Sequence, residues 1–262
     1  MEKITARTNE KIKYAVKLGE SPSFRRKNGE FILEGARLCS DAAKTGIEIR
    51  SAFITSKAFS KYEGYIGEIS AGGCICYEIS EDIAKKLSDT ENPQGVFCVC
   101  RSDVTVADIS NINPDGKYIF LENVQDPSNL GAVSRTAEAL GIDGMIICGG
   151  CDIYNPKALR ASMGSALRLS IMTCDDAVGL IRELGSKGML TLASTPDSSA
   201  ELITEVPMNG GVVCVVGDEG NGVTQEVMSV SAKRVTIPMN GRAESLNAST
   251  AAAILIWEMV RK

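Results

Sequence analysis

Histidine is absent from all 262 residues of this sequence. Its absence excludes every mechanism that needs an imidazole base or ligand, including Ser-His-Asp and Cys-His catalysis. Aromatic residues make up only 5% of the chain, and just one of them is a tryptophan. The chemistry of the protein must therefore be sought among its other polar residues.

Long hydrophobic runs are also missing. No apolar stretch is long enough to span a bilayer, and the first residues, MEKITARTNEK, lack the apolar core of a signal peptide. We therefore expect a cytoplasmic protein with no membrane partner. Its nine cysteines are not expected to form disulfides in a reducing compartment.

The cysteines include two Cys-x-Cys pairs, at 74–76 and 98–100, and a Cys-Gly-Gly-Cys sequence at 148–151. The two pairs supply enough thiols for a four-cysteine zinc site. Zinc sites usually use a longer spacing, however, and both pairs lie in apolar, strand-like runs, CICYEI and GVFCVC. We interpret them as small buried hydrophobic residues, and we predict no metal site.

Charge is unevenly distributed along the chain. The net charge is −5, which argues against a protein that coats nucleic acid non-specifically. Residues 1–27, by contrast, hold eight basic side chains and three acidic ones, a local net charge of +5. This segment fits an RNA contact and equally fits a solvated surface helix, and charge alone leaves both interpretations open.

The length and the 44% apolar content favour two domains, each with its own core. Residues 1–102 alternate short strands with helices, including a basic helix at about 8–18 and a helix capped by Ser80, and predict a small α/β domain. Residues 103–116 are polar, end in Pro-Asp-Gly and are interpreted as a linker. Residues 117–262 alternate more strongly and predict a doubly wound α/β domain with a parallel sheet.

Three loops of the second domain follow predicted strands, where open parallel sheets bind their ligands. In the first, residues 123–141, Ser128 or Asn129 can cap a helix whose start is a natural anion site. Arg135 falls on the polar side of that helix, within reach of a phosphate. The alternative is an ordinary capping residue with a surface arginine.

The second loop, residues 215–223, reads VVGDEGNGV. Its Gly-x-x-Gly-x-Gly order is neither the dinucleotide fingerprint nor a phosphate-binding loop. Such glycines let a backbone bend sharply or approach a flat ligand closely. By itself the pattern also fits a tight loop that exposes Asp218 and Glu219.

The third loop precedes a helix within residues 237–259. Pro238 ends a strand, and Ser245 and Asn247 place polar groups at the helix start. The alanines that follow allow very close packing against a partner. A capped helix in the domain core fits these features, and so does a helix pair at a dimer interface.

Taken together, these segments resemble the SpoU (TrmH-like) family of RNA ribose 2′-O-methyltransferases, part of the SPOUT superfamily. DPSNLGAVSRTAEALG, VVGDEGNGV and IPMNGRAESLNAS occur in the family order, and MGSALRL at 163–169 is also similar to a family segment. FILEGARLCSDAAKTG and ENPQGVFCVC resemble the N-terminal substrate-binding domain of many members. Asp218 departs from the Ser, Asn or Ala that many members have there.

The resemblance implies a trefoil-knotted, parallel-sheet methyltransferase domain, preceded by a small α/β RNA-binding domain that is similar to a ribosomal protein. It implies a homodimer with its active site near the dimer interface, and S-adenosylmethionine bound in the knot. The matching functional positions are Asn129, Arg135, Glu219, Ser245 and Asn247, and the matching cofactor positions are Gly217, Gly222, Ile237, Met239 and Leu246.

The implied activity is methylation of a ribose 2′-hydroxyl in RNA, and the extra N-terminal domain favours ribosomal RNA. The alternatives are a tRNA ribose methyltransferase and a non-catalytic RNA-binding protein. A metabolic nucleotide-binding enzyme fits less well, because the dinucleotide fingerprint is absent. The family proposal makes Arg135 a general base, whereas the high pKa of guanidinium favours a phosphate clamp.

Overall fold

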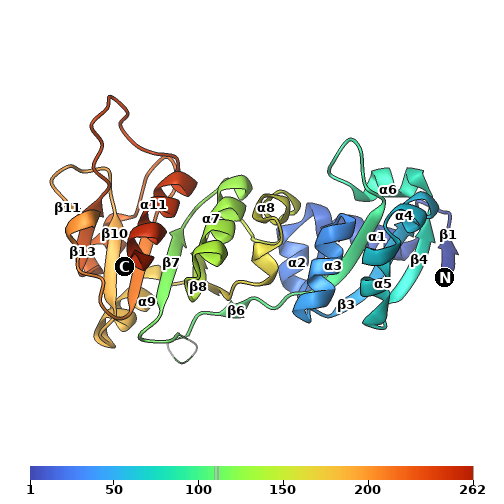
Figure 1. Cartoon of the computed structure of the whole chain (residues 1–262), viewed down its shortest axis with the longest axis horizontal. Helices are drawn as coiled ribbons and strands as arrows, with labels where there is room; N and C mark the ends of the chain where they lie inside the picture. The colour runs from blue at the N-terminus through green and yellow to red at the C-terminus, as the bar shows by residue number, and fades with distance from the viewer. Residues whose placement is uncertain (109, 111, 262) are drawn as a thin grey trace. The chain divides into compact units, whose positions relative to one another are not determined.

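A computed structural model gives the conformation of residues 1–108, 110 and 112–261 (Figure 1). The chain divides into two compact units. The first comprises Met1–Asp103 and Tyr154–Leu167, and the second comprises Val104–Ile153 and Arg168–Lys262. The domain boundaries drawn from the sequence remain a proposal, and in the structure residues 154–167 group with the first unit.

The first unit is built on a five-stranded sheet with the order β1-β4-β3-β5-β2, in which β5 runs antiparallel to its neighbours. Its strands are β1 Glu2–Ile4, β2 Glu30–Glu34, β3 Ile49–Thr55, β4 Ile75–Ile79 and β5 Val96–Arg101. Its helices are α1 Glu10–Glu20, α2 Pro22–Asn28, α3 Ala36–Thr45, α4 Ser56–Lys61, α5 Glu63–Ala71, α6 Glu81–Leu87 and α8 Pro156–Ser162.

Helices α1 and α6 form one side of the core of the first unit. Ile12 and Leu18 of α1 and Ile83 of α6 pack with Phe53 and Phe97 of the sheet. The helix predicted at about 8–18 is thus confirmed. Ser80 caps α6 as predicted, because its side chain accepts a hydrogen bond from the backbone N–H of Ile83 at 3.3 Å.

The basic N-terminal segment is only partly available to a ligand. The Arg25 side chain is 3% exposed, and its guanidinium donates to the carbonyl oxygens of Leu18 and Gly19 at the end of α1. Lys3 and Arg7 form ion pairs within the same unit. Arg25 therefore stabilises the end of α1. The interpretation of Arg25 as an exposed charge of the basic segment is wrong.

The second unit is built on an eight-stranded sheet with the order β11-β13-β10-β12-β7-β8-β9-β6, all of whose strand pairs are parallel. Its strands are β6 Thr105–Val106, β7 Lys117–Glu122, β8 Gly144–Cys148, β9 Ile171–Cys174, β10 Leu190–Ser194, β11 Glu201–Leu202, β12 Val212–Val216 and β13 Lys233–Thr236. Its helices are α7 Pro127–Leu140, α9 Ala177–Ser186, α10 Gln225–Val230 and α11 Ala248–Val260.

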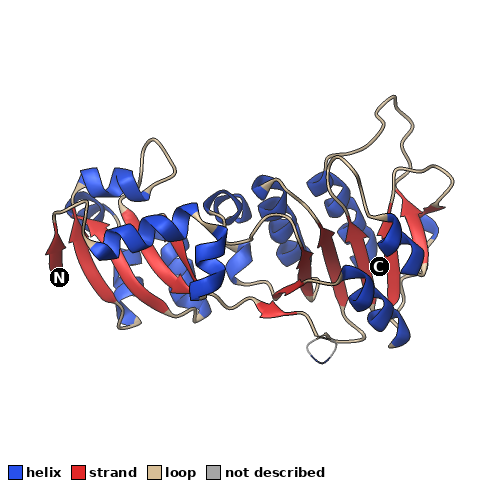
Figure 2. Cartoon of the chain, turned by 180° about the vertical axis from the view of Figure 1, so that it is seen from behind, coloured by secondary structure: helices blue, strands red, loops and turns tan. Residues whose placement is uncertain are grey.

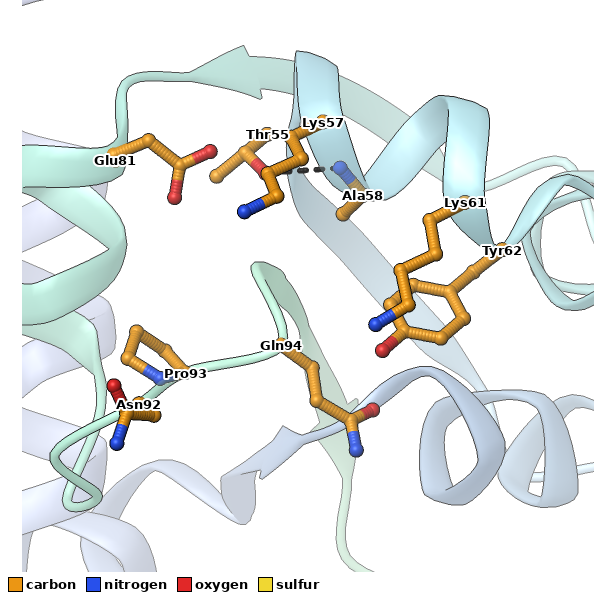
Figure 3. Close-up of a pocket in the computed structure, with 9 residues that line it drawn as sticks. All are labelled: Thr55, Lys57, Ala58, Lys61, Tyr62, Glu81, Asn92, Pro93 and Gln94. Carbon is orange, nitrogen blue, oxygen red and sulfur yellow. Dashed lines mark hydrogen bonds between the residues drawn. The ribbon is translucent and has the colours of Figure 1, made fainter.

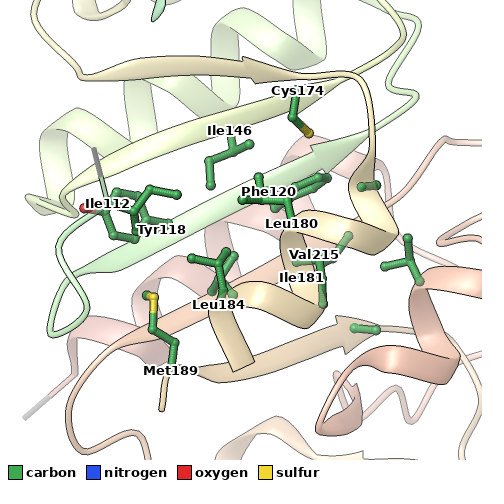
Figure 4. Close-up of a cluster of buried hydrophobic side chains, with 14 of the residues drawn as sticks. Ile112, Tyr118, Phe120, Ile146, Cys174, Leu180, Ile181, Leu184, Met189 and Val215 are labelled. Carbon is green, nitrogen blue, oxygen red and sulfur yellow. The ribbon is translucent and has the colours of Figure 1, made fainter. Parts of the chain in front are cut away.

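Helices cover both faces of this sheet (Figure 2). On one face, Phe120 of β7 and Val215 of β12 pack against Leu180 and Leu184 of α9 (Figure 4). Since successive strand residues alternate in direction, the other side chains of β7 and β12 point toward α11, which packs on both strands, while α7 packs on β8 beside α11. Strand β12 is buried along its whole apolar run VVCVV, as expected for a strand covered on both faces, which confirms the predicted parallel sheet.

The structure differs from the sequence pattern at two places. Thr105–Val106 of the predicted linker forms β6, which pairs with β9. The run NPKALRASMGSA at 155–166 predicts one helix, and this prediction is wrong for its second part, because α8 ends at Ser162, where Met163 takes a left-handed conformation with φ 51°. The trefoil knot implied by the resemblance stays a prediction. None of the described helices is both long enough and apolar enough to cross a bilayer.

Candidate functional site

The polar motifs of the second unit follow strands β7, β12 and β13. These strands are parallel, so their carboxyl ends meet at one edge of the sheet. The loop after β7 leads into α7, the loop after β12 leads into α10, and the segment after β13 leads into α11. Helices α7 and α11 pack against each other (Figure 1), which brings the first and third motifs together.

Helix α7 begins at Pro127, and its N-cap is Asp126. The Asp126 carboxylate accepts a hydrogen bond from the backbone N–H of Ser128 at 2.8 Å. The prediction that Ser128 or Asn129 caps this helix is therefore wrong. Proline is favoured at the first helical position because it has no N–H to satisfy, so the residue before it becomes the cap. Asn129 then lies in the first turn with its side chain free for another role.

Asn129 joins the three motifs through its side-chain amide. Its Nδ2 donates to Oε1 of Glu219 at 2.7 Å, and its Oδ1 accepts from Nδ2 of Asn247 at 3.0 Å. The side chain is 6% exposed, and both of its polar atoms have a partner. A buried amide that uses both ends in this way fixes the relative positions of the loops that hold its partners.

Asn247 is the N-cap of α11. Its Oδ1 accepts from the backbone N–H groups of Ser249 and Thr250, at 2.9 and 3.3 Å. Its Nδ2 remains free to donate to Asn129. One side chain therefore starts the helix and ties that start to α7.

The loop after β12 is closed by two glycines. A Cβ on Gly217 would lie 2.0 Å from the carbonyl carbon of Gly222, so the two backbones touch where a side chain has no room. Gly222 has φ 69°, and its N–H donates to the carbonyl oxygen of Asp218 at 2.9 Å. The hydrogen bond from the Asn221 amide lowers the pKa of the Asp218 carboxyl below its ordinary value.

A buried carboxylate that the motifs did not reveal holds the far end of this loop. Glu122, the last residue of β7, is 4% exposed, and its two oxygens accept from the backbone N–H and the hydroxyl of Thr224, at 2.9 and 2.7 Å. Thr224 is also the N-cap of α10. The sequence does contain a signal for this residue, because Glu122 is the one acidic residue of the apolar run YIFLE and ends that run.

The remaining predicted residues lie around this network without joining it through a described hydrogen bond. Arg135 is exposed on α7, and its guanidinium has no hydrogen bond or ion pair among the described residues. Ser245 is exposed just before α11. The structure places Ile237, Met239 and Leu246 half-buried along the segment between β13 and α11.

The cysteines are all free thiols. Cys98 and Cys100 are buried on β5, as expected for small hydrophobic residues, and burial raises the pKa of the Cys100 thiol well above its ordinary value. Cys74 and Cys76 are only half-buried, so the prediction of buried residues is wrong for that pair. Within the described part of the chain no three residues of the metal-ligating types gather into a group that could hold an ion.

Two protein families match the two parts of the chain. Residues 116–257 match the SpoU rRNA Methylase family, and residues 9–98 match the MRM3-like substrate binding domain. A protein of Bacillus subtilis named 23S rRNA (guanosine(2553)-2′-O)-methyltransferase is 30% identical over 99% of this chain and 99% of its own length.

A second relative, the 23S rRNA (uridine(2479)-2′-O)-methyltransferase of Streptomyces viridochromogenes, is 26% identical over 91% of this chain and 85% of its own length. The crystal structure of an AdoMet-bound rRNA methyltransferase from Sinorhizobium meliloti superposes with a TM-score of 0.87 and 26% identity, covering 99% of this chain and 97% of that one. The family match spans more than half of the sequence, and it contains the whole network centred on Asn129. The chain belongs to the SpoU rRNA methylase family.

Proposed function

We propose that this protein transfers a methyl group from S-adenosylmethionine to a ribose 2′-hydroxyl of ribosomal RNA. The observation that carries the proposal is the pair of hydrogen bonds from Asn129 to Glu219 and Asn247, which assembles three loops within the SpoU match. The named relatives that match nearly the whole chain act on 23S rRNA. With ribosomal RNA as the substrate, we also propose that the protein acts in the cytoplasm.

The residues after β12 and β13 fit the cofactor. The contact of Gly217 with Gly222 closes the turn, and a Cβ on Gly222 would meet nothing within 4 Å, so a flat ligand can approach the backbone there without meeting a side chain. Ile237, Met239 and Leu246 supply half-buried apolar surface for its uncharged parts. S-adenosylmethionine bound there supplies an electrophilic methyl group.

Arg135 prepares the substrate. A ribose hydroxyl is a poor nucleophile, so the protein must orient its oxygen toward the methyl carbon and give its proton a destination. A guanidinium presents a planar fork of N–H donors and no acceptor, so Arg135 is a phosphate clamp and not a base. Its exposed group, which has no described partner, holds the phosphate beside the target ribose.

S-adenosylmethionine held by the residues after β12 and β13 would supply the methyl carbon that bonds to the 2′-oxygen as the sulfur–carbon bond breaks. The proton of the hydroxyl leaves to the clamped phosphate or to water. Alignment alone contributes much of the rate in reactions of this kind.

The Asn129 network keeps the loops in place during this reaction. Glu219 braces the glycine turn through Asn129, and Asn247 braces the start of α11. Ser245, two residues before that cap, shapes the segment that faces the cofactor. These side chains act by position, and no proton transfer is assigned to them.

A homodimer completes the assembly in this proposal. Helix α11 is apolar nearly all round, and Trp257 is 53% exposed on it in the single chain. A helix with that pattern is normally buried on every side. Light scattering of the purified protein tests the dimer, and a Trp257→Glu variant is expected to be monomeric.

The function is tested with RNA from cells that lack this protein. The purified chain and S-adenosylmethionine are added to that RNA, and 2′-O-methylated positions are mapped before and after. A new methylation in 23S rRNA is the expected result. A new methylation only in tRNA would show that the protein is a tRNA ribose methyltransferase instead. No methylation in either RNA, together with no cofactor binding by calorimetry, would overturn the proposal.

A further inference from the structure

The first unit contains a cavity that belongs to neither the Asn129 network nor the glycine turn. Its volume is about 180 Å³, and it lies between α4, α6 and the segment that leads into β5 (Figure 3). This volume is below the ~300–1,000 Å³ of typical small-molecule sites. The cavity therefore suits one part of a larger ligand.

Two lysines of α4 give the cavity a positive side. Lys57 and Lys61 are four residues apart on one helix, which places them on the same face, and Figure 3 shows both amino groups on the cavity side. Neither forms an ion pair with a described residue. The acidic lining residue, Glu81, stands across the cavity on α6. The lining thus carries a positive charge in a protein whose net charge is −5.

The other side of the cavity carries flat and amide groups. Tyr62 presents a half-buried ring beside Lys61, whose Nζ lies 5.0 Å from the ring centroid. Pro93 is also half-buried, and Asn92 and Gln94 bring side-chain amides to the lining. Ring faces and amide edges are the groups that proteins use to hold an unstacked nucleobase.

The amide of Gln94 is held in a fixed orientation. Its Oε1 accepts a hydrogen bond from the backbone N–H of Ala36 at 3.0 Å, which leaves Nε2 to donate elsewhere. The backbone after it is equally constrained, because Gly95 has φ 76° and a Cβ there would lie 2.5 Å from Oγ1 of Thr55. A preformed donor at the cavity lowers the entropic cost of binding.

We propose that this cavity binds one nucleotide of the RNA substrate, distinct from the nucleotide that is methylated. Lys57 and Lys61 contact its phosphate, the base stacks on Tyr62 and Pro93, and the amides of Asn92 and Gln94 meet the base edge. The inference rests on the proposed function, since it takes RNA as the substrate. It assigns to the first unit a defined contact with single-stranded RNA.

The test uses the full chain and a 23S rRNA transcript. A Lys57→Gln/Lys61→Gln variant is compared with Arg182→Gln/Lys187→Gln, which removes the same charge from exposed residues in and just after α9 of the second unit, outside the cavity and outside the basic segment 1–27. The cavity variant is expected to bind the transcript roughly tenfold more weakly, and the slope of log K against log salt should fall by about 0.7–0.9 for each lost phosphate contact. The control variant should bind within about twofold of the parent.

A second measurement addresses the base. Ultraviolet cross-linking of the parent chain to a transcript that contains 4-thiouridine should yield peptides that include Tyr62, and a Tyr62→Leu variant should lose them. RNA binding by the lysine variant equal to that of the parent, or an equal loss in both double variants, would overturn the proposal. Failure of the parent chain to bind S-adenosylmethionine counts against the proposed function instead, because that binding does not involve the cavity.

Discussion

Nδ2 of Asn129 donates a hydrogen bond to Oε1 of Glu219 across 2.7 Å, although 90 positions separate the two residues. The same amide accepts from Asn247, which lies 118 positions away. Because one side chain serves both contacts, the glycine turn and the start of α11 depend on each other. A change at Asn129 should therefore affect cofactor binding through both loops at once.

Replacing Asn129 by Asp tests that dependence. The new carboxylate still accepts from Asn247, but it faces Glu219 with like charge and no donor. We expect weaker S-adenosylmethionine binding by calorimetry and a stability loss of about 1–3 kcal/mol in urea unfolding. Adding Glu219→Gln should restore both properties in part, because the Gln amide donates back to Asp. A double variant no better than Asn129→Asp alone would mean that this hydrogen bond does not organise the loops.

Arg135→Lys separates charge from geometry. Lysine keeps the positive charge but loses the planar fork that holds a phosphate through two hydrogen bonds. Methyl transfer to rRNA should fall by roughly 10²-fold, since a small misplacement of the ribose is enough for that loss. The affinity for S-adenosylmethionine and the melting temperature should stay at the parent values, because Arg135 is exposed and has no described partner. Near-normal transfer by Arg135→Ala would exclude the clamp.

Local sequence patterns correctly predicted features that depend on neighbouring residues, such as buried strands and helix caps. The apolar run of β12 identified a strand covered on both faces, and Ser80 identified the start of α6. The cap of α7 was also available from local rules, since Pro127 at the first helical position points to Asp126. Short elements such as β6 carry too few residues for a periodic signal.

The contacts of the candidate site required the tertiary structure. The resemblance named Asn129, Glu219 and Asn247, but no spacing shows that one amide bridges the other two. For Arg25 the sequence pattern was misleading. The basic segment 1–27 predicted exposed charges, whereas the Arg25 guanidinium is buried against the carbonyl end of α1. Both outcomes depend on which residues the tertiary fold brings into contact, and a local sequence pattern does not specify those contacts.

Gly217→Ala is expected to disable the turn after β12. The added Cβ would lie 2.0 Å from the carbonyl carbon and 2.1 Å from the carbonyl oxygen of Gly222, so backbone must move. We expect a stability loss of about 1–3 kcal/mol or more and no detectable cofactor binding by calorimetry. Gly241→Ala is the matched control in a neighbouring loop, because a Cβ there meets nothing within 4 Å. Its stability should change by less than about 0.5 kcal/mol, and equal effects of the two substitutions would contradict a role for the close contact.

The same turn should respond to acid through Asp218. The Asn221 amide holds the pKa of Asp218 below the ordinary value of 3.8, so the folded turn favours the ionised carboxylate. An aspartate with a lowered folded pKa stabilises the protein above its unfolded pKa, and that contribution disappears as the pH falls through the folded value. Asp218→Ala should therefore be less stable than the parent by a constant amount from about pH 7 to pH 5, and the difference should shrink below about pH 4.

Urea unfolding of the parent and of Asp218→Ala across this range measures the difference directly. Asn221→Ala provides a second arm, because it removes the donor and leaves the carboxylate in place. Its deficit relative to the parent should shrink over the same acid window, since protonated Asp218 no longer attracts the amide. A deficit that stays constant down to about pH 3 in both variants would show that the turn does not depend on the ionised carboxylate. The departure from Ser, Asn or Ala at position 218 would then have no acid-dependent consequence for the fold.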